Sequence, residues 1–189
     1  LTYKVESDGG TWVLRRPPLG HVLPTAHDMA REYRVLTGVA KVGYPAPKPI
    51  ALCEDAAVND YPFYVMEYRE GVIIAEELPP GYAETEDQRQ AISRALVATL
   101  VQLHAIDYEA VGLGDFGRPD GYIERQVRRW AEQWGRSETR PLAEVNELIK
   151  RLKAALPVSP PPAIVHGDYR LGNMMLGSDE PGRVVAVLD

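Results

Sequence analysis

The chain has 189 residues, of which 45% are hydrophobic and 25% charged, and its formal net charge is −6. This composition suits one domain or two small lobes, and the acidic balance argues against non-specific nucleic-acid binding, which depends on basic surface. No apolar run approaches the roughly 18 residues that a membrane-crossing helix needs, and no signal peptide is visible. A single cysteine, Cys53, excludes an internal disulfide framework and fits a reducing compartment. We therefore expect a cytoplasmic protein with neither a membrane nor a nucleic acid as partner.

The first third of the chain has the pattern of strands. A turn at residues 8–10 separates residues 3–6 from residues 12–15, which predicts a hairpin. After two prolines, a helix is predicted from near Thr25, with Asp28 three residues later as a partial capping box. Two further strands are expected near residues 50–53 and 63–68.

From Gly71 onward the pattern changes to helix. Thr85 and Gln88 form a capping box that opens a long helix ending near Ala105. Two shorter helices are predicted over about residues 120–134 and 142–156. Short apolar strands are then expected at residues 163–165, 174–176 and 184–188. Strands followed by helices indicate an α+β chain.

The most specific signal is the run His166-Gly167-Asp168-Tyr169-Arg170-Leu171-Gly172-Asn173. Its spacing is that of the kinase loop H-R-D-x-x-x-x-N, in which Asp takes the acceptor hydroxyl's proton and Asn holds a magnesium ion. Random placement of the same residues would produce this pattern roughly 0.004 times in such a chain. Asp189 follows the next apolar strand, where the site needs a second metal-binding carboxylate. We therefore predict Asp168 as the catalytic base and Asn173 and Asp189 as Mg²⁺ ligands.

Phosphoryl transfer also needs a cation on the nucleotide's phosphates. Arg15 ends the strand at 12–15, where the kinase pattern V-A-I-K has a Lys that pairs with the phosphates and with a helix Glu. Glu32, in the following predicted helix, is the expected partner, although either charge alone also suits a solvated surface. Adenine is expected at the backbone of Glu67 and Tyr68, where the fourth strand runs into a linker.

Three other features are interpreted without a catalytic role. Asp115-Phe116-Gly117 spells the kinase metal motif D-F-G, but it precedes the catalytic loop instead of following it, so we interpret it as a turn. The pattern G-x-x-x-x-G-K-[ST] is absent and a P-loop enzyme is not supported; the Gly-rich phosphate loop of kinases is also missing. His166 is interpreted as a structural loop residue that hydrogen-bonds nearby backbone.

These motifs resemble the aminoglycoside phosphotransferase / choline kinase-like family. Residues 165–173 look like its signature H-G-D-x-x-x-x-N, with Gly in place of the Arg of protein kinases, and residues 187–189 are similar to the start of its metal-binding I-D-W/F segment. A subgroup found beside acyl-CoA dehydrogenase domains looks most similar. The stretches that carry this closer resemblance are residues 12–18, 31–36, 63–68 and 103–107.

The resemblance implies a protein kinase-like two-lobe α+β fold that is truncated at both ends. Residues 1–69 would form the nucleotide-binding lobe and residues 70–189 the helical lobe with the catalytic loop. It also implies ATP and Mg²⁺ as cofactors, a small-molecule hydroxyl acceptor, and an acyl-CoA dehydrogenase as a fused or neighbouring partner. We expect the chain to be a fragment of a longer protein, because it has no initiator Met and stops at the end of an apolar strand.

The primary prediction is an O-phosphotransferase that moves the γ-phosphate of ATP to an aminoglycoside-like or hydroxyacyl-type acceptor. Two alternatives stay open. A nucleotide-binding pseudokinase module that regulates a partner enzyme is suggested by the Arg that replaces the usual Lys at position 15. A metal-dependent phosphoesterase would use His166, Asp168 and Asp189.

Overall fold

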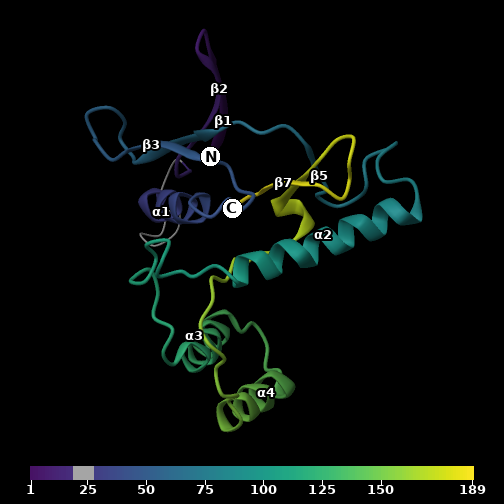
Figure 1. Cartoon of the computed structure of the whole chain (residues 1–189). Helices are drawn as coiled ribbons and strands as arrows, with labels where there is room; N and C mark the ends of the chain where they lie inside the picture. The colour runs from purple at the N-terminus through teal and green to yellow at the C-terminus, as the bar shows by residue number, and fades with distance from the viewer. Residues whose placement is uncertain (19–27) are drawn as a thin grey trace. The chain divides into compact units, whose positions relative to one another are not determined.

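A computed structural model describes residues 1–18 and 28–189 and shows an α+β chain, as predicted (Figure 1). It divides into two compact units. The core unit comprises residues 1–113 and 163–189, and the helical unit comprises residues 114–162. The predicted lobe boundary after residue 69 remains a prediction. The predicted helix start at Thr25 lies outside the described residues.

A four-stranded antiparallel sheet forms the first part of the core unit. The predicted hairpin is present as β1 (Thr2–Ser7) and β2 (Gly10–Arg15), and its turn uses Gly10 at a φ of +141°, a conformation that favours glycine. β3 (Pro49–Cys53) and β4 (Phe63–Glu67) complete the sheet in the order β1-β2-β4-β3. β2 therefore lies between β1 and β4, which places its last residue, Arg15, opposite Tyr64.

Helix α1 (Met29–Ala40) packs against β3 and β4. Asp28 caps it by accepting a hydrogen bond from the Arg31 N–H at 2.9 Å, which satisfies one of the free donors of the first turn. At the other end, Lys41 Nζ donates to the Val111 carbonyl at 2.9 Å. The helix is thus held at both ends, which fixes the position of Glu32 in its first turn.

A second, three-stranded sheet carries the end of the chain. Its order is β5 (Val72–Ile73), β6 (Met174–Leu176) and β7 (Val184–Val187), all antiparallel. Helix α2 (Glu86–His104) lies in the same unit and begins with the predicted capping box, in which the Thr85 hydroxyl accepts from the Gln88 N–H. Leu176 at the end of β6 is 0% exposed, so this small sheet is part of the main core.

One predicted strand is absent from the structure, and one short strand is present without having been predicted. Residues 163–165 form no strand, and Val165 is 62% exposed, because the segment has no ladder partner among the described residues. β5, in contrast, was not predicted. Two residues are too short to show a strand pattern, and β5 exists because it pairs with β6, about a hundred residues later in the chain.

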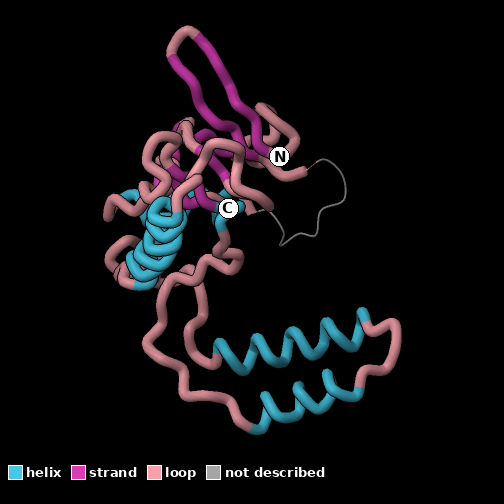
Figure 2. The backbone as a smooth tube through the Cα atoms, turned by 90° about the vertical axis from the view of Figure 1, so that its right-hand side faces the viewer, coloured by secondary structure: helices cyan, strands magenta, loops and turns pink. Residues whose placement is uncertain are grey.

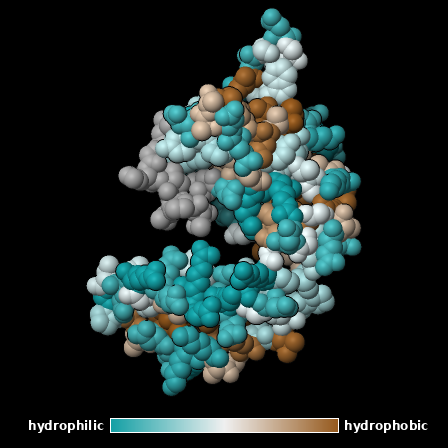
Figure 3. Space-filling view, turned by 90° about the vertical axis from the view of Figure 1, so that its left-hand side faces the viewer, coloured by the Kyte–Doolittle hydropathy of each residue, from teal (hydrophilic) through white to brown (hydrophobic). Residues whose placement is uncertain are grey.

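The helical unit consists of α3 (Tyr122–Ser137) and α4 (Ala143–Ala154), which run antiparallel as a hairpin (Figure 2). Neither helix has a buried residue. On the face shown in Figure 3, this unit, in the lower part of the view, is covered largely by hydrophilic residues with smaller hydrophobic patches. Within residues 1–18 and 28–189, no helix combines the length and apolarity needed to cross a bilayer.

Candidate active site

The predicted catalytic loop is a compact structure closed by its own side chains. The 3-10 turn η1 (Leu171–Asn173) turns the chain back, so that Asn173 Nδ2 donates to the Asp168 carboxylate at 2.8 Å and to its backbone carbonyl at 3.0 Å. Asn173 is 8% exposed, whereas the Asp168 side chain is exposed. The buried amide therefore fixes a carboxylate that remains accessible.

The charge of Asp168 is supported from two sides. Arg170 Nε donates to the Asp168 carboxylate at 3.1 Å. Hydrogen bonds from Arg170 first, and then from Asn173, hold the pKa of Asp168 below its ordinary value. Asp168 is thus ionised at neutral pH and can accept a proton.

His166 connects the catalytic loop to the end of β7, as its structural interpretation predicts. Its Nδ1 accepts from the Asp168 N–H at 3.4 Å, which assigns the hydrogen to Nε2, and Nε2 then donates to the Leu188 carbonyl at 3.1 Å. Both ring nitrogens are engaged, which argues against His166 as a metal ligand and so against the phosphoesterase alternative. Gly167 allows the turn between His166 and Asp168, because its φ of +90° is a conformation that favours glycine.

Asp189 is placed beside this loop by backbone hydrogen bonds. The Leu188 N–H donates to the Asn173 carbonyl at 2.8 Å, and the Val187 N–H donates to the Pro45 carbonyl at 2.7 Å. Asp189 itself has a φ of +67°, which Asp tolerates better than most residues. The two predicted metal ligands are therefore held near one another at the same end of two paired strands, with Asn173 just before β6 and Asp189 just after β7.

The predicted ion pair between Arg15 and Glu32 is present. Arg15 Nε lies 2.6 Å from Glu32 Oε2, and the Arg15 side chain is 18% exposed. Arg15 Nη2 also donates to Asp189 Oδ1, which links the end of β2 to the end of β7. Burial is the largest single influence and lowers the pKa of Arg15, but the charge of Glu32, together with Tyr64 and the hydrogen bonds to Glu32 and Asp189, raises that pKa above its ordinary value. The guanidinium stays charged between two carboxylates.

Glu67 and Tyr68 lie at the end of β4, away from these contacts. Glu67 pairs across the sheet with Trp12, three positions before Arg15, or about 10 Å along the strand. The Glu67 N–H already donates to the Lys48 carbonyl at 2.9 Å, and Lys4 Nζ lies 4.9 Å from the centre of the Tyr68 ring. Glu67 could therefore offer a nucleotide base its carbonyl, but not its N–H.

The donors present fit a magnesium ion. Mg²⁺ prefers hard oxygen ligands, and it usually binds one or two protein groups together with substrate phosphates and water. Because Asn173 turns its Nδ2 toward Asp168, its Oδ1 is left as an acceptor, and the Asp189 carboxylate is exposed. The described residues contain no group of three or more His, Cys, Asp or Glu side chains that could hold a metal. The candidate site thus suits a metal shared with phosphates.

Sequence reasoning missed two residues of this site, Arg170 and Tyr64. Arg170 occupies a variable position of the motif, and only the fold shows that it reaches Asp168. Tyr64 donates its hydroxyl to Glu32 Oε2 at 3.1 Å from the neighbouring strand. The only sequence feature that could have indicated a role for Arg170 is its charge inside the motif. No sequence feature indicated a role for Tyr64.

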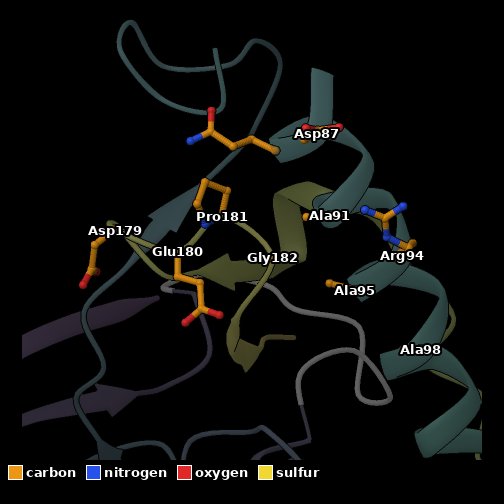
Figure 4. Close-up of a pocket in the computed structure, with 10 residues that line it drawn as sticks. Asp87, Ala91, Arg94, Ala95, Ala98, Asp179, Glu180, Pro181 and Gly182 are labelled. Carbon is orange, nitrogen blue, oxygen red and sulfur yellow. The ribbon is translucent and has the colours of Figure 1, made fainter. Parts of the chain in front are cut away.

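An open groove of about 560 Å³ lies elsewhere in the core unit (Figure 4). It runs between α2, with Ala91, Ala95 and Ala98 on its wall, and the turn at residues 179–182. None of the predicted site residues lines it, so the groove is separate from the candidate active site.

The whole chain, residues 1–189, matches the model of the APH phosphotransferase enzyme family. The chain belongs to this family. Mouse acyl-CoA dehydrogenase family member 10 is 37% identical over 188 residues, and chicken acyl-CoA dehydrogenase family member 11 is 37% identical over 189 residues. The match covers 100% of this chain but only 17% and 24% of those two proteins. The predicted resemblance to this subgroup is thereby confirmed.

Solved structures confirm the predicted fold class. A Ralstonia eutropha protein assigned as an aminoglycoside phosphotransferase superposes with a TM-score of 0.86 at 38% identity, and the match covers 100% of this chain and 54% of that one. An aminoglycoside-3'-phosphotransferase of type VIII gives a TM-score of 0.65 at 22% identity, with 100% and 65% covered. The second likeness shows the fold alone.

Proposed function

We propose that this chain carries the site of an ATP- and Mg²⁺-dependent phosphotransferase that moves the γ-phosphate to a hydroxyl of a small molecule. The observation that carries the proposal is the gathering of Asp168, Asn173 and Asp189. The Asn173 side chain bonds Asp168 at 2.8 Å, while the Asn173 carbonyl accepts from Leu188, the residue before Asp189, at 2.8 Å. Base and candidate metal ligands thus share one small structure.

The residues divide the work of the reaction. The acceptor's oxygen bonds the γ-phosphorus, the bond from that phosphorus to the bridging oxygen of ADP breaks, and Asp168 takes the hydroxyl proton. Arg15, held by Glu32, would contact the non-transferred phosphates. Magnesium bound by Asn173 Oδ1 and Asp189 would supply charge neutralisation on the phosphate oxygens. Adenine would lie at the backbone of Glu67 and Tyr68.

The acceptor is proposed from two kinds of relative. Proteins 37% identical to the chain are named acyl-CoA dehydrogenase family members, which suggests a hydroxyacyl-type acceptor and a dehydrogenase as fused or neighbouring partner. The Ralstonia structure at 38% identity suggests an aminoglycoside-like acceptor. The proposed setting is the cytosol, which suits the single free Cys53.

The test is Asp168→Ala in the protein at its natural length, assayed with ATP, Mg²⁺ and a panel of hydroxyacyl-CoAs and aminoglycosides. We expect phosphorylated product from the parent and a loss of about 10²–10⁴-fold in the variant. Asp179→Ala is the matched control. Asp179 is an exposed carboxylate on the turn at residues 179–182, so its substitution should leave the rate unchanged. An Asp168→Ala rate near that of the parent would contradict the assignment.

A pseudokinase module is the second candidate, and one contact favours it. Arg15 Nη2 donates to Asp189, so the cation is bonded to a carboxylate that the metal requires. Magnesium-dependent ATP binding without product from any acceptor would support the pseudokinase.

A further inference from the structure

Tyr64 is a buried residue that contacts the Arg15–Glu32 pair and has no role in the proposed reaction so far. It lies on β4, directly opposite Arg15 of β2 in the sheet register. It is 3% exposed and packs with Met29 and Met66 between the sheet and α1. From there its hydroxyl donates to Glu32 Oε2 at 3.1 Å. One buried side chain thus connects the strand that faces Arg15 to the helix that carries Glu32.

The Glu32 carboxylate receives three hydrogen bonds from two side chains. Oε2 accepts from Arg15 Nε at 2.6 Å and from the Tyr64 hydroxyl at 3.1 Å, while Oε1 accepts from Arg15 Nη2 at 3.5 Å. The terminal torsion of a Glu side chain is soft, and the Arg15 contact to Oε1 is long at 3.5 Å, so Arg15 alone restricts rotation of the carboxylate only weakly. The second donor on Oε2 restricts that rotation and, with it, the orientation of the guanidinium.

The orientation matters because an arginine is a planar fork of five N–H donors, whereas a lysine is a point charge. The Nε and Nη2 edge of Arg15 is occupied by Glu32 and Asp189. Nη1 has no hydrogen-bond partner among the described residues. Its two N–H groups are therefore the part of the fork that is available to phosphate oxygens.

We propose that Tyr64 is a positioning residue that, through Glu32, sets which edge of the Arg15 guanidinium is presented to the nucleotide's phosphates. The inference rests on the proposed function, because it takes Arg15 as the phosphate ligand. It also accounts for the arginine where kinases have lysine, since a fork needs its plane fixed and a rotating ammonium does not. Burial first, and then the charge of Glu32, raise the pKa of Tyr64, so the hydroxyl keeps its proton and remains a donor.

The chain offers two matched controls for Tyr64→Phe. Tyr82 is also a buried tyrosine with one hydrogen bond, to the Gly177 carbonyl at 2.8 Å, but it belongs to the core cluster around Leu176 and does not contact Arg15. Tyr33 packs edge-on against Tyr64 with ring centres 6.2 Å apart, and its hydroxyl has no hydrogen bond to any described residue. Tyr82→Phe therefore reports a lost structural hydrogen bond, and Tyr33→Phe reports the loss of a hydroxyl beside Tyr64.

The binding experiment measures the Kd of Mg-ATP by calorimetry in the protein at its natural length. We expect Tyr64→Phe to raise Kd about 3- to 10-fold, because one lost hydrogen bond acts on the nucleotide only through Arg15. Tyr82→Phe should lower the melting temperature and leave Kd within about twofold. In an Arg15→Lys background, Tyr64→Phe should weaken binding no further, because the guanidinium that it orients is gone. Additive effects of the two substitutions would overturn the proposal.

A second measurement needs no nucleotide. In ¹⁵N-labelled protein, the Nε–H resonance of Arg15 reports its bond to Glu32. We expect this resonance to shift in Tyr64→Phe and to stay in place in Tyr82→Phe and Tyr33→Phe. If the parent bound no ATP, the proposed function would fail, while the Arg15 resonance would still decide whether Tyr64 positions the guanidinium. An unchanged resonance in Tyr64→Phe overturns the inference.

Discussion

The core unit and the helical unit bury their side chains very differently. Every buried hydrophobic residue in the described part of the chain lies in residues 1–113 or 163–189. The two helices of the helical unit bury none, and Trp130 on α3 is 59% exposed.

The difference shows where the precision of the candidate site comes from. All seven predicted site residues belong to the core unit, on or directly beside elements that pack into its two hydrophobic clusters. Packed elements hold side chains in single rotamers, which is what a catalytic arrangement needs. A helix pair without buried residues is held mainly by its own helical hydrogen bonds and amphipathic contact. Matched substitutions in the two units should therefore have different effects.

The largest difference is expected for leucine truncation. Leu176 is 0% exposed at the end of β6, whereas Leu148 on α4 is 54% exposed. We expect Leu176→Ala to lower the free energy of unfolding by about 2–5 kcal/mol, because it leaves a cavity in the core. Leu148→Ala should change it by no more than about 0.5 kcal/mol. Guanidinium unfolding followed by circular dichroism measures both, and equal losses would remove the distinction between the units.

The second difference concerns the two asparagines Asn173 and Asn146. Asn173→Ala removes the bond to Asp168 and one candidate metal ligand, so we expect the Mg²⁺ concentration for half-maximal activity to rise about 10- to 100-fold. Asn146 lies on the exposed surface of α4, and Asn146→Ala should leave the Mg²⁺ requirement unchanged. A metal titration of the phosphotransfer rate decides this. An unaltered requirement in Asn173→Ala would mean that Asn173 is structural.

Two glycines should respond with opposite signs. Gly167 has a φ of +90°, so Gly167→Ala strains the backbone and should destabilise the protein by about 1–2 kcal/mol, although the space for a methyl group is open. Gly135 lies inside α3 with nothing within 4 Å of the place that a Cβ would occupy, and Gly135→Ala should stabilise the helical unit by up to about 1 kcal/mol. Thermal unfolding measures the change in stability, and hence its sign, for each substitution. Stabilisation by Gly167→Ala would show that the loop adopts another backbone conformation.

Local spacing made part of the site predictable. Asp168 and Asn173 are five residues apart, and one short turn is enough to bring their side chains together. The spacing of the motif therefore predicts their contact without any other part of the chain. Arg15 and Glu32 are seventeen residues apart, yet a strand followed by a packed helix leaves few arrangements, and the predicted ion pair is present at 2.6 Å. The start of α2 was predictable because its capping box is a local signal.

The remaining features depend on contacts that no local pattern encodes. Tyr64 reaches Glu32 because α1 packs against β4, and it lies opposite Arg15 because β4 pairs with β2. β5 is a strand only because β6 lies beside it, and residues 163–165 are apolar but have no neighbouring strand to pair with. In both cases the tertiary partner decided the outcome and the residue type did not.

The smallest expected difference is between two exposed ion pairs, and pH separates them. Arg170 Nε lies 3.1 Å from the Asp168 carboxylate in the core unit, and Arg151 Nε lies 2.9 Å from the Glu147 carboxylate in the helical unit. The pKa of Asp168 is held low chiefly by the Arg170 hydrogen bond, so Arg170→Ala should raise that pKa toward its ordinary value. A carboxyl with a lowered pKa contributes stability above its unfolded pKa, and this contribution is lost as the pH falls through the folded value. The acidic limb of the rate profile should therefore move to higher pH in Arg170→Ala.

The Arg151–Glu147 pair of the helical unit serves as the control for the Arg170–Asp168 pair. Arg151→Ala removes a pair of the same geometry, and it should leave the acidic limb where the parent has it. A ¹³C carboxyl titration of Asp168 by NMR gives the pKa without any acceptor. If Arg170→Ala left the Asp168 titration in place, the Asn173 hydrogen bond would have to hold that carboxylate ionised alone. The hydrogen bond from Asn173 Nδ2 to the carboxylate, and not the exposed guanidinium, would then set the charge of Asp168.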